Sequence, residues 1–122
     1  MSMKKIIVVD DSAVLRTTMQ NALNSAGYEV ISAVPGSAGL FETLAKGETP
    51  DLLLLDMFFP DESGLDILKK VRGLHPKLKV LVITAMNRPA LNKEIRQTGC
   101  DDILHKPFDL DDLITAIQKL SE

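Results

Sequence analysis

The sequence lacks several features, and each absence excludes a class of protein. Its 122 residues include no tryptophan, one tyrosine and one cysteine, Cys100, so no internal disulfide can form. A disulfide-stapled secreted fold is therefore excluded, and the reducing cytoplasm is the expected location. No apolar run reaches the ~18 residues that a membrane span needs, and no signal-peptide pattern opens the chain. We therefore expect no association with membranes.

The chain also lacks an excess of positive charge. Fourteen lysines and arginines stand against 17 aspartates and glutamates, which gives a net charge of −3. A protein that binds the phosphates of nucleic acid needs a basic surface. Because the net charge here is negative, we expect no direct nucleic-acid binding. The remaining composition, 45% hydrophobic and 25% charged, is that of an ordinary globular protein. The length suits a single domain over residues 1–122.

Five apolar runs alternate with five helical patterns along the chain. The runs predict strands at Lys5–Asp10, Tyr28–Val34, Asp51–Asp56, Lys79–Thr84 and Asp102–His105. The first, third and fourth read as strands buried on both faces, whereas the second alternates like a strand near a sheet edge. Apolar stripes at helical spacing lie between the runs, and the first four helices are predicted to end at Gly27, Gly47, Gly73 with Pro76, and Gly99.

This alternation predicts an α/β fold. Strands and helices in turn produce a doubly wound five-stranded parallel sheet, with five helices covering its two faces through right-handed crossovers. Ligands of such sheets bind at the carboxyl ends of the strands. The pattern of elements therefore also predicts where a site would lie.

Four of the five predicted strands end in residues that together suit metal-assisted phosphoryl transfer. They are Asp10 and Asp11, Asp56, Thr84, and Lys106 followed by Pro107. Clustered carboxylates raise one another's pKa unless a cation neutralises them, and Mg²⁺ (or Mn²⁺) prefers such oxygen ligands. An oxygen of Asp56 can then attack a phosphoryl group whose charge Lys106 offsets, with Thr84 donating a hydrogen bond.

Each of these residues also has a more ordinary explanation. Asp11 with Ser12 can cap the following helix, Thr84 can be a plain strand-end hydroxyl, and Lys106 a solvated lysine. The coincidence at four strand ends favours a shared site over these separate roles.

Four segments carry a resemblance to a known family. IIVVDDSAVLR, LLLLDMFFPDESGLDIL, VLVITAM and HKPF, in this order, resemble bacterial response-regulator receivers over about residues 4–120. The resemblance implies the CheY-like, flavodoxin-like fold with strand order 2-1-3-4-5. It also implies a phosphorylation-dependent signalling domain rather than an enzyme with a substrate of its own.

The resemblance assigns roles to the residues at the strand ends. Asp56 would be the phosphoacceptor, Thr84 the switch hydroxyl and Lys106 the phosphate-binding lysine, with a cis Lys106–Pro107 bond. The metal would be held by the carboxylates of Asp11 and Asp56 and the backbone carbonyl of Phe58, with Asp10 acting through water. Pro60 and Gly64 match the turn after the third strand, where Gly64 would supply backbone freedom.

The resemblance also implies partners. A sensor histidine kinase or a histidine phosphotransfer protein would supply the phosphoryl group. A surface built from the fourth helix, fifth strand and fifth helix would control an unknown downstream protein or output domain. The domain would be a monomer or a phosphorylation-linked dimer.

Two positions depart from the family's usual pattern. Ile103 stands where the fifth strand usually carries an aromatic residue, so we hypothesise that the switch runs through Thr84 and the loop of residues 85–88. Phe58 and Met86 are large and apolar at positions that tune the rates, which predicts a long-lived phosphorylated state. An alternative is that Phe58 and Phe59 form a hydrophobic contact surface.

Four other classes of protein share part of this pattern. A phosphatase of the haloacid dehalogenase type needs DxDx[TV], where this chain has DDSAV, and a P-loop nucleotidase needs GxxxxGK[ST], which is absent. A flavodoxin-like mononucleotide carrier needs a phosphate-binding loop where this chain is acidic. A structural pseudo-receiver, folded but never phosphorylated, stays open.

Overall fold

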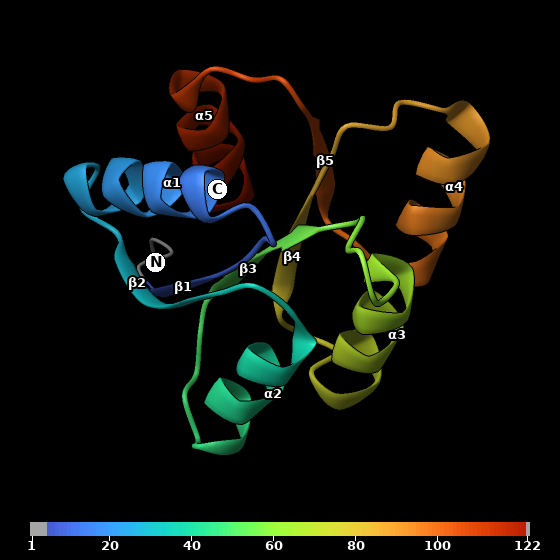
Figure 1. Cartoon of the computed structure of the whole chain (residues 1–122), viewed down its shortest axis with the longest axis horizontal. Coiled ribbons are helices and arrows are strands. Elements are labelled where there is room, and N and C mark those ends of the chain that lie inside the picture. The colour runs from blue at the N-terminus through green and yellow to red at the C-terminus, as the bar shows by residue number, and fades with distance from the viewer. Residues whose placement is uncertain (1–4, 122) are drawn as a thin grey trace.

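The computed structural model describes residues 5–121, so residues 1–4 and 122 of the predicted domain lie outside the described residues (Figure 1). The strands are β1 (Lys5–Val9), β2 (Glu29–Val34), β3 (Leu52–Asp56), β4 (Lys79–Thr84) and β5 (Asp102–His105). The helices are α1 (Ala13–Ser25), α2 (Ser37–Ala45), α3 (Gly64–Leu74), α4 (Pro89–Thr98) and α5 (Leu110–Ser121). None of these helices, within residues 5–121, is long and apolar enough to cross a membrane.

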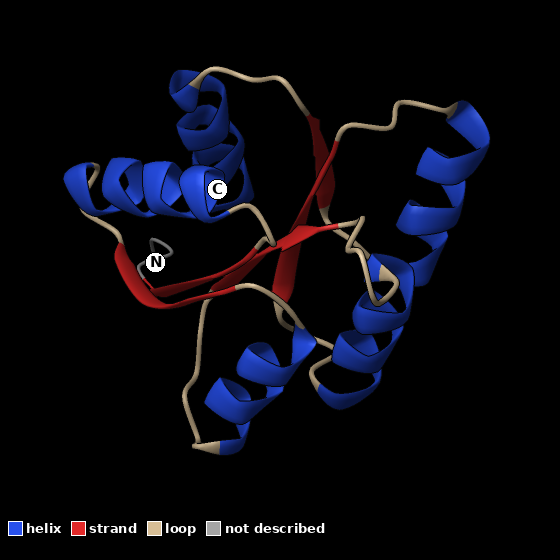
Figure 2. Cartoon of the chain, viewed as in Figure 1, coloured by secondary structure: helices blue, strands red, loops and turns tan. Residues whose placement is uncertain are grey.

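The strands form one parallel sheet in the order β2-β1-β3-β4-β5. Helices α1 and α5 cover one face, and α2, α3 and α4 cover the other (Figures 1 and 2). The predicted fold class, strand order and edge position of the second strand are confirmed. Because all strands run the same way, their carboxyl ends meet at one edge of the sheet.

Alternate residues of the strands point to opposite faces of the sheet, and their side chains pack into two separate cores. Leu53 and Leu55 of β3 pack among α2, α3 and α4, whereas Leu52 and Leu54 pack among α1 and α5. All five residues of β3 are buried, as are four of the five in β1 and five of the six in β4. The prediction that these three strands are buried on both faces is confirmed, and it makes β3 a rigid support for whatever follows it.

The third helix was predicted to end at Gly73 with Pro76, and the role of Gly73 is wrong. Gly27, Gly47 and Gly99 lie past their helices with positive φ, as predicted, but Gly73 stays within α3, which runs on to Leu74. The helix does not continue through His75, its C-cap, because the following Pro76 disfavours helical backbone in the residue before it. Predicted strands also extended one residue too far at Asp10, Tyr28 and Asp51.

Arg72 joins three segments at the edge of the sheet opposite the carboxyl ends. Its guanidinium donates to the backbone carbonyls of Gly99 (2.7 Å), Leu78 (2.6 Å) and Pro76 (3.0 Å). It also lies 3.5 Å from the carboxylate of Asp101, which accepts the Val80 amide. The end of α3, the loop into β4 and the loop into β5 are therefore tied to a single side chain.

Candidate functional site

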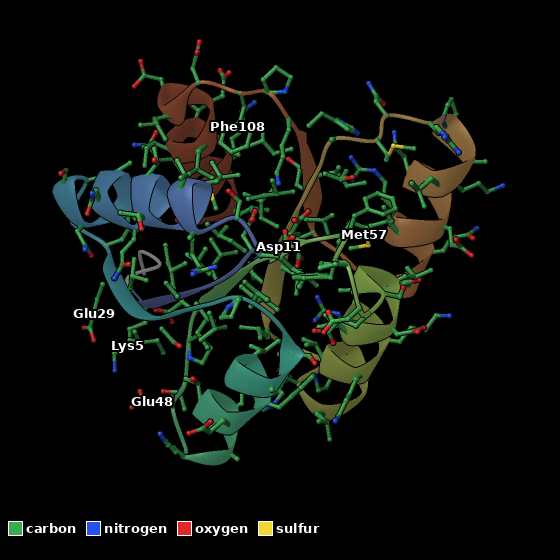
Figure 3. The ribbon with its side chains drawn as sticks, viewed as in Figure 1. Lys5, Asp11, Glu29, Glu48, Met57 and Phe108 are labelled. Atoms are coloured by element: carbon green, nitrogen blue, oxygen red, sulfur yellow. The ribbon has the colours of Figure 1, made fainter. Side chains whose placement is uncertain are left out.

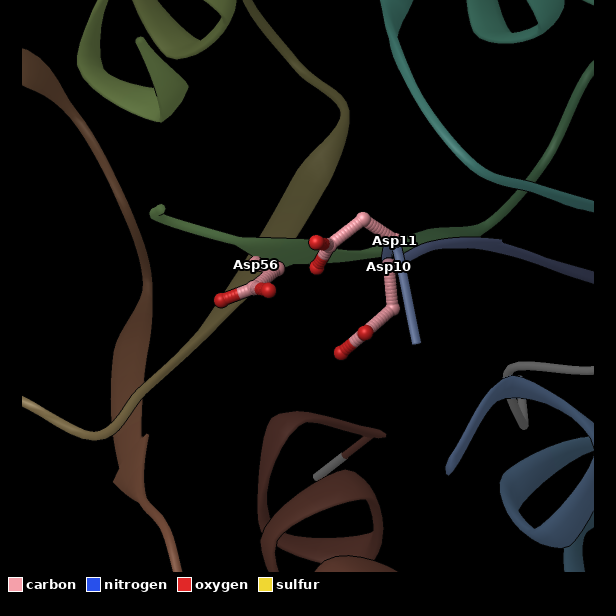
Figure 4. A group of neighbouring side chains, drawn as sticks. All are labelled: Asp10, Asp11 and Asp56. Carbon is pink, nitrogen blue, oxygen red and sulfur yellow. The ribbon is translucent and has the colours of Figure 1, made fainter. Parts of the chain in front are cut away.

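Three carboxylates meet where β1 and β3 end. Asp10 and Asp11 follow β1, Asp56 is the last residue of β3, and each offers an oxygen within 4.8 Å of the others (Figure 4). Asp10 and Asp56 are buried, with 1% and 5% of their surface exposed, while Asp11 is exposed. Asp11 lies where the chain leaves β1 for α1, and Met57 where it leaves β3 (Figure 3). The predicted acidic cluster is therefore present.

Lys106 brings a positive charge to the two buried carboxylates. Its ammonium nitrogen lies 3.2 Å from Oδ2 of Asp10 and 3.5 Å from Oδ2 of Asp56. The peptide bond from Lys106 to Pro107 is cis, as the resemblance implied. Residues from β1, β3 and the end of β5 thus converge, although Lys106 is 96 positions from Asp10.

Backbone amides hold the two buried carboxylates in place. Oδ1 of Asp56 accepts the amide of Met57 at 2.7 Å and, more weakly, that of Phe58 at 3.5 Å. Oδ1 of Asp10 accepts the amide of Ser12 at 2.8 Å. Both side chains therefore have fixed orientations, which a reaction at one defined oxygen requires.

The charge of Asp56 is only partly compensated. Burial raises the pKa of this carboxyl above its ordinary value, and the nearby charge of Asp10 raises it further. The Lys106 ammonium and the amides of Met57 and Phe58 act in the opposite direction without cancelling the rise in pKa. The prediction that clustered carboxylates raise a pKa is confirmed for Asp56, with burial as the larger cause.

The donor set suits a small divalent cation. Three carboxylates face one ammonium, so the cluster carries an excess of negative charge and offers the hard oxygen ligands that Mg²⁺ takes. The side chains of Asp11 and Asp56 and the carbonyl of Phe58 are the groups predicted to hold the metal. Phe58 lies two residues past Asp56 and forms a bridge with Ser63 across the loop.

Thr84 borders the cluster but is engaged elsewhere. It ends β4, is fully buried, and its hydroxyl accepts the amide of Met86 at 3.1 Å. Its backbone carbonyl accepts the amide of Lys106 at 2.9 Å. The structure therefore connects Thr84 to the loop of residues 85–88 and to the lysine. Within residues 5–121, the Thr84 hydroxyl forms no hydrogen bond to a carboxylate.

The alternative that Asp11 with Ser12 caps the following helix is confirmed for Ser12 and not for Asp11. Ser12 is the N-cap of α1, and its hydroxyl accepts the amide of Leu15 at 3.2 Å. Sequence reasoning missed Arg16, which donates to the Asp10 carbonyl at 2.7 Å, and the hydrogen bond by which Glu62 accepts the Ser37 amide at 3.0 Å. Neither lies in a motif that spacing alone would single out.

The chain matches the family model of the response regulator receiver domain over residues 6–118. It belongs to that family. As a receiver, the chain is a signalling domain of two-component systems, whose members partner with histidine kinases and output domains and typically bind Mg²⁺ at an acidic pocket.

Relatives of this receiver differ in length. It is 29% identical to chemotaxis protein CheY of Thermotoga maritima over 119 residues, 98% of each chain. It is 32% identical to sporulation initiation phosphotransferase F of Bacillus subtilis over 95% of this chain and 92% of that one. It is 38% identical to the DNA-binding transcriptional regulator NtrC of Rhizobium meliloti over 92% of this chain, but it spans only 23% of that protein. The receiver thus covers about a quarter of the length of its NtrC relatives.

Solved structures agree with this fold. A CheY-like receiver domain protein from Methanospirillum hungatei superposes with a TM-score of 0.88 at 26% identity, over 98% of this chain and 94% of that one. A response regulator from Thermotoga maritima gives 0.84 at 31% identity, over 97% of both chains.

Proposed function

We propose that this receiver accepts a phosphoryl group on Asp56 from a phosphohistidine of a sensor histidine kinase or a histidine phosphotransfer protein. An oxygen of Asp56 forms the new bond to phosphorus while the bond to the histidine nitrogen breaks, and the departing imidazole takes up a proton. The observation that carries the proposal is the Lys106 ammonium placed between the buried carboxylates of Asp10 and Asp56. That ammonium can offset the charge on the transferred group.

The surroundings of the three carboxylates favour Asp56 as the acceptor. Asp10 has both oxygens engaged, one by the Ser12 amide and the other by Lys106 at 3.2 Å, and only 1% of it is exposed. Asp11 is exposed. Oδ2 of Asp56 is the least tightly held oxygen of the two buried groups, 3.5 Å from Lys106, while Oδ1 is fixed by the Met57 amide.

Mg²⁺ or Mn²⁺, when bound, supplies positive charge that offsets the carboxylates and the phosphoryl oxygens. The groups proposed to hold it are the carboxylates of Asp11 and Asp56 and the carbonyl of Phe58, with Asp10 acting through water. The support for this set is the excess negative charge of the cluster.

The switch is proposed to run through Thr84. Its hydroxyl would leave the Met86 amide, donate to a phosphoryl oxygen and carry the loop of residues 85–88 with it. Ile103 packs against the core beneath α3 and α4 and is aliphatic, so it offers no ring or hydroxyl to exchange partners. Structures with and without a beryllofluoride mimic should therefore differ at Thr84 and this loop, and identical structures would reject the hypothesis.

The readout surface is proposed to lie on α4, β5 and α5, including Arg88, Lys93 and Arg96. Full-length relatives such as CheY consist of a receiver alone, whereas NtrC is a longer DNA-binding regulator. The output is accordingly proposed as a downstream protein or an attached domain, and the receiver itself as a monomer or a phosphorylation-linked dimer.

A mass measurement tests the central proposal. The protein is incubated with Mg²⁺ and acetyl phosphate, and intact mass is expected to show one phosphoryl addition that chelation of the metal prevents. Asp56→Asn should abolish the addition, while Asp61→Asn, an exposed aspartate in the same loop, should leave it unchanged. No addition to the wild-type protein would support the structural pseudo-receiver instead, and addition to Asp56→Asn would reject Asp56 as the acceptor.

A further inference from the structure

Helix α2 begins without a cap of its own. Its N-cap residue is Gly36, which has no side chain to accept the unpaired amides of the first turn. An oxygen of Glu62 accepts the Ser37 amide instead, at 3.0 Å, from a loop 25 positions further along the chain. The carboxylate also lies at the positive end of the helix dipole, where negative charge is favoured.

Glu62 belongs to the loop that follows Asp56. The Gly64 amide closes this loop at its base by donating to the Met57 carbonyl at 3.0 Å, and Ser63 pairs with Phe58 across it. A side chain on Gly64 would collide with the Met57 backbone, so this glycine serves close approach rather than the predicted backbone freedom. Glu62, next to Ser63, is thus one residue from the pair that fixes Phe58.

The bond from Glu62 to Ser37 connects the loop to a second, independent part of the fold. Residues 35–39 and 60–62 form the walls of a hollow of about 480 Å³ that opens beside Asp11. Phe59 packs against the core at the start of the 58–63 loop, and the bond from Glu62 to Ser37 ties the later part of the loop to the start of α2. The loop position decides where the amide and carbonyl of Phe58 lie relative to Asp56.

We propose that Glu62 is a positioning residue for the phosphorylation site: by capping α2 it holds the loop that presents Phe58 to the metal. The inference rests on the proposed function, because it assumes that the acidic cluster binds Mg²⁺. Residues that orient metal ligands from outside contribute about tenfold or more to metal affinity.

Gly36 offers a way to displace Glu62 without replacing it. A Cβ built on Gly36 would lie 2.7 Å from Oε2 of Glu62, the end of a flexible side chain. The backbone at Gly36 is extended, with φ of −173°, so alanine fits there without strain. Gly36→Ala is therefore expected to push the carboxylate away from the Ser37 amide.

The test measures Mg²⁺ affinity by isothermal titration calorimetry, together with the phosphorylation rate at limiting and saturating Mg²⁺. Glu62→Ala is expected to weaken Mg²⁺ binding about tenfold and to slow phosphorylation at limiting but not at saturating Mg²⁺. Glu62→Gln keeps an acceptor oxygen and should weaken binding less. Gly36→Ala should resemble Glu62→Ala, and the double variant should bind no worse than either single one, because both remove the same bond.

Thr43→Val is the matched control. It removes the hydrogen bonds that the Thr43 hydroxyl donates to the Ser32 hydroxyl of β2 and to the Gly39 carbonyl within α2, and so disturbs the same helix without touching Glu62. It should leave Mg²⁺ affinity unchanged. Affinity within twofold of wild type in Glu62→Ala, or additive effects in the double variant, would overturn the inference.

The two proposals fail in different ways. If the wild-type protein binds Mg²⁺ but takes no phosphoryl group, the proposed function fails while the calorimetric test of Glu62 still stands. If the wild-type protein binds no Mg²⁺, both are wrong.

Discussion

Asp56 carries a negative charge in a place that only partly compensates it. Burial and Asp10 raise its pKa, so the folded protein holds a proton at this carboxyl more tightly than the unfolded chain does. Ionisation therefore destabilises the fold at pH values above the raised pKa, and stability returns as the pH falls through it. Asp56 is also the proposed phosphoacceptor. The residue proposed to carry the function is therefore one whose ionised form lowers the free energy of unfolding.

The neutral variant Asp56→Asn is expected to be more stable than the wild-type protein near pH 7. A gain of ~1 kcal/mol would raise the melting temperature by about 4 °C in a domain of this size. The difference should shrink on acidification, because the wild-type carboxyl then becomes neutral as well. Thermal unfolding followed by circular dichroism at pH 7 and pH 5 measures it. Asp61→Asn, an exposed change, should stay within about 0.5 kcal/mol, and a gap that widens at pH 5 would contradict the explanation.

The two phenylalanines after Asp56 have different surroundings. Phe59 packs against the core beneath α2, α3 and α4, whereas Phe58 is 49% exposed. The alternative of a hydrophobic contact surface therefore stays a prediction, to which the partly buried Phe59 offers less area than Phe58. Of the two, Phe58 is the more exposed apolar side chain near the acceptor.

Phe58→Asn is expected to speed hydrolysis of the phosphorylated state. An amide can orient an attacking water that a phenyl ring excludes, and a hydrogen bond worth ~1 kcal/mol corresponds to about fivefold in rate. Loss of the added mass over time, after removal of acetyl phosphate, gives the rate. Phe58→Leu keeps the apolar character and should hydrolyse at the wild-type rate. Equal lifetimes in Phe58→Asn and the wild-type protein would reject the shielding role.

Among the elements, the end of α3 depends most on one side chain. Arg72 is 20% exposed at its side chain and donates to carbonyls in two loops, those that lead into β4 and β5, so its removal leaves the partly buried carbonyls of Gly99 and Leu78 without this donor. We expect Arg72→Met, which keeps the aliphatic stem, to lower the free energy of unfolding by about 2–3 kcal/mol in urea titrations.

Arg96 provides the comparison for Arg72. It forms an exposed ion pair with Asp102 at 3.3 Å, with side chains 53% and 38% exposed. Pairs of this kind contribute little, so Arg96→Met should change the free energy of unfolding by no more than about 0.5 kcal/mol. Equal losses in the two variants would show that the contacts of Arg72 are not the cause.

Regular elements were predictable because their signals are local. The bounds of β4 and β5 agree with the prediction, since apolar runs between polar ends define them, and Gly99 ends α4 with φ of +122° as its residue type suggested. Gly73 misled because a glycine is compatible with both a helix end and a helix interior. The proline three positions later decided the outcome.

The site was predictable in part. Asp10, Asp11, Asp56 and Lys106 come together because parallel strands bring their carboxyl ends to one edge. The hydrogen bond of Thr84 to Met86 and the bond of Glu62 to Ser37 could not be foreseen. They depend on loop conformations, and the second joins residues far apart in the sequence with no periodic pattern to connect them.

At the scale of the whole molecule, metal binding and folding are linked. A cation that binds the folded protein and not the unfolded chain stabilises it by about 2.7 kcal/mol at one hundred times its dissociation constant. The melting temperature should therefore rise with Mg²⁺, measured against KCl of the same ionic strength. Asp11→Asn, which removes a proposed ligand from an exposed position, should abolish the rise. A rise of equal size in KCl would indicate a general salt effect.

The helices differ in how firmly they are held. Residue Ile95 is the one fully buried residue of α4, whereas α3 buries Gly64, Ile67, Leu68 and Val71. Local opening of α4 therefore exposes the least apolar surface, so its amide protons should exchange with solvent before those of α3. A partner or an attached domain that contacts α4 would therefore meet a segment whose rearrangement withdraws one fully buried side chain, Ile95, from the core beneath α2, α3 and α4.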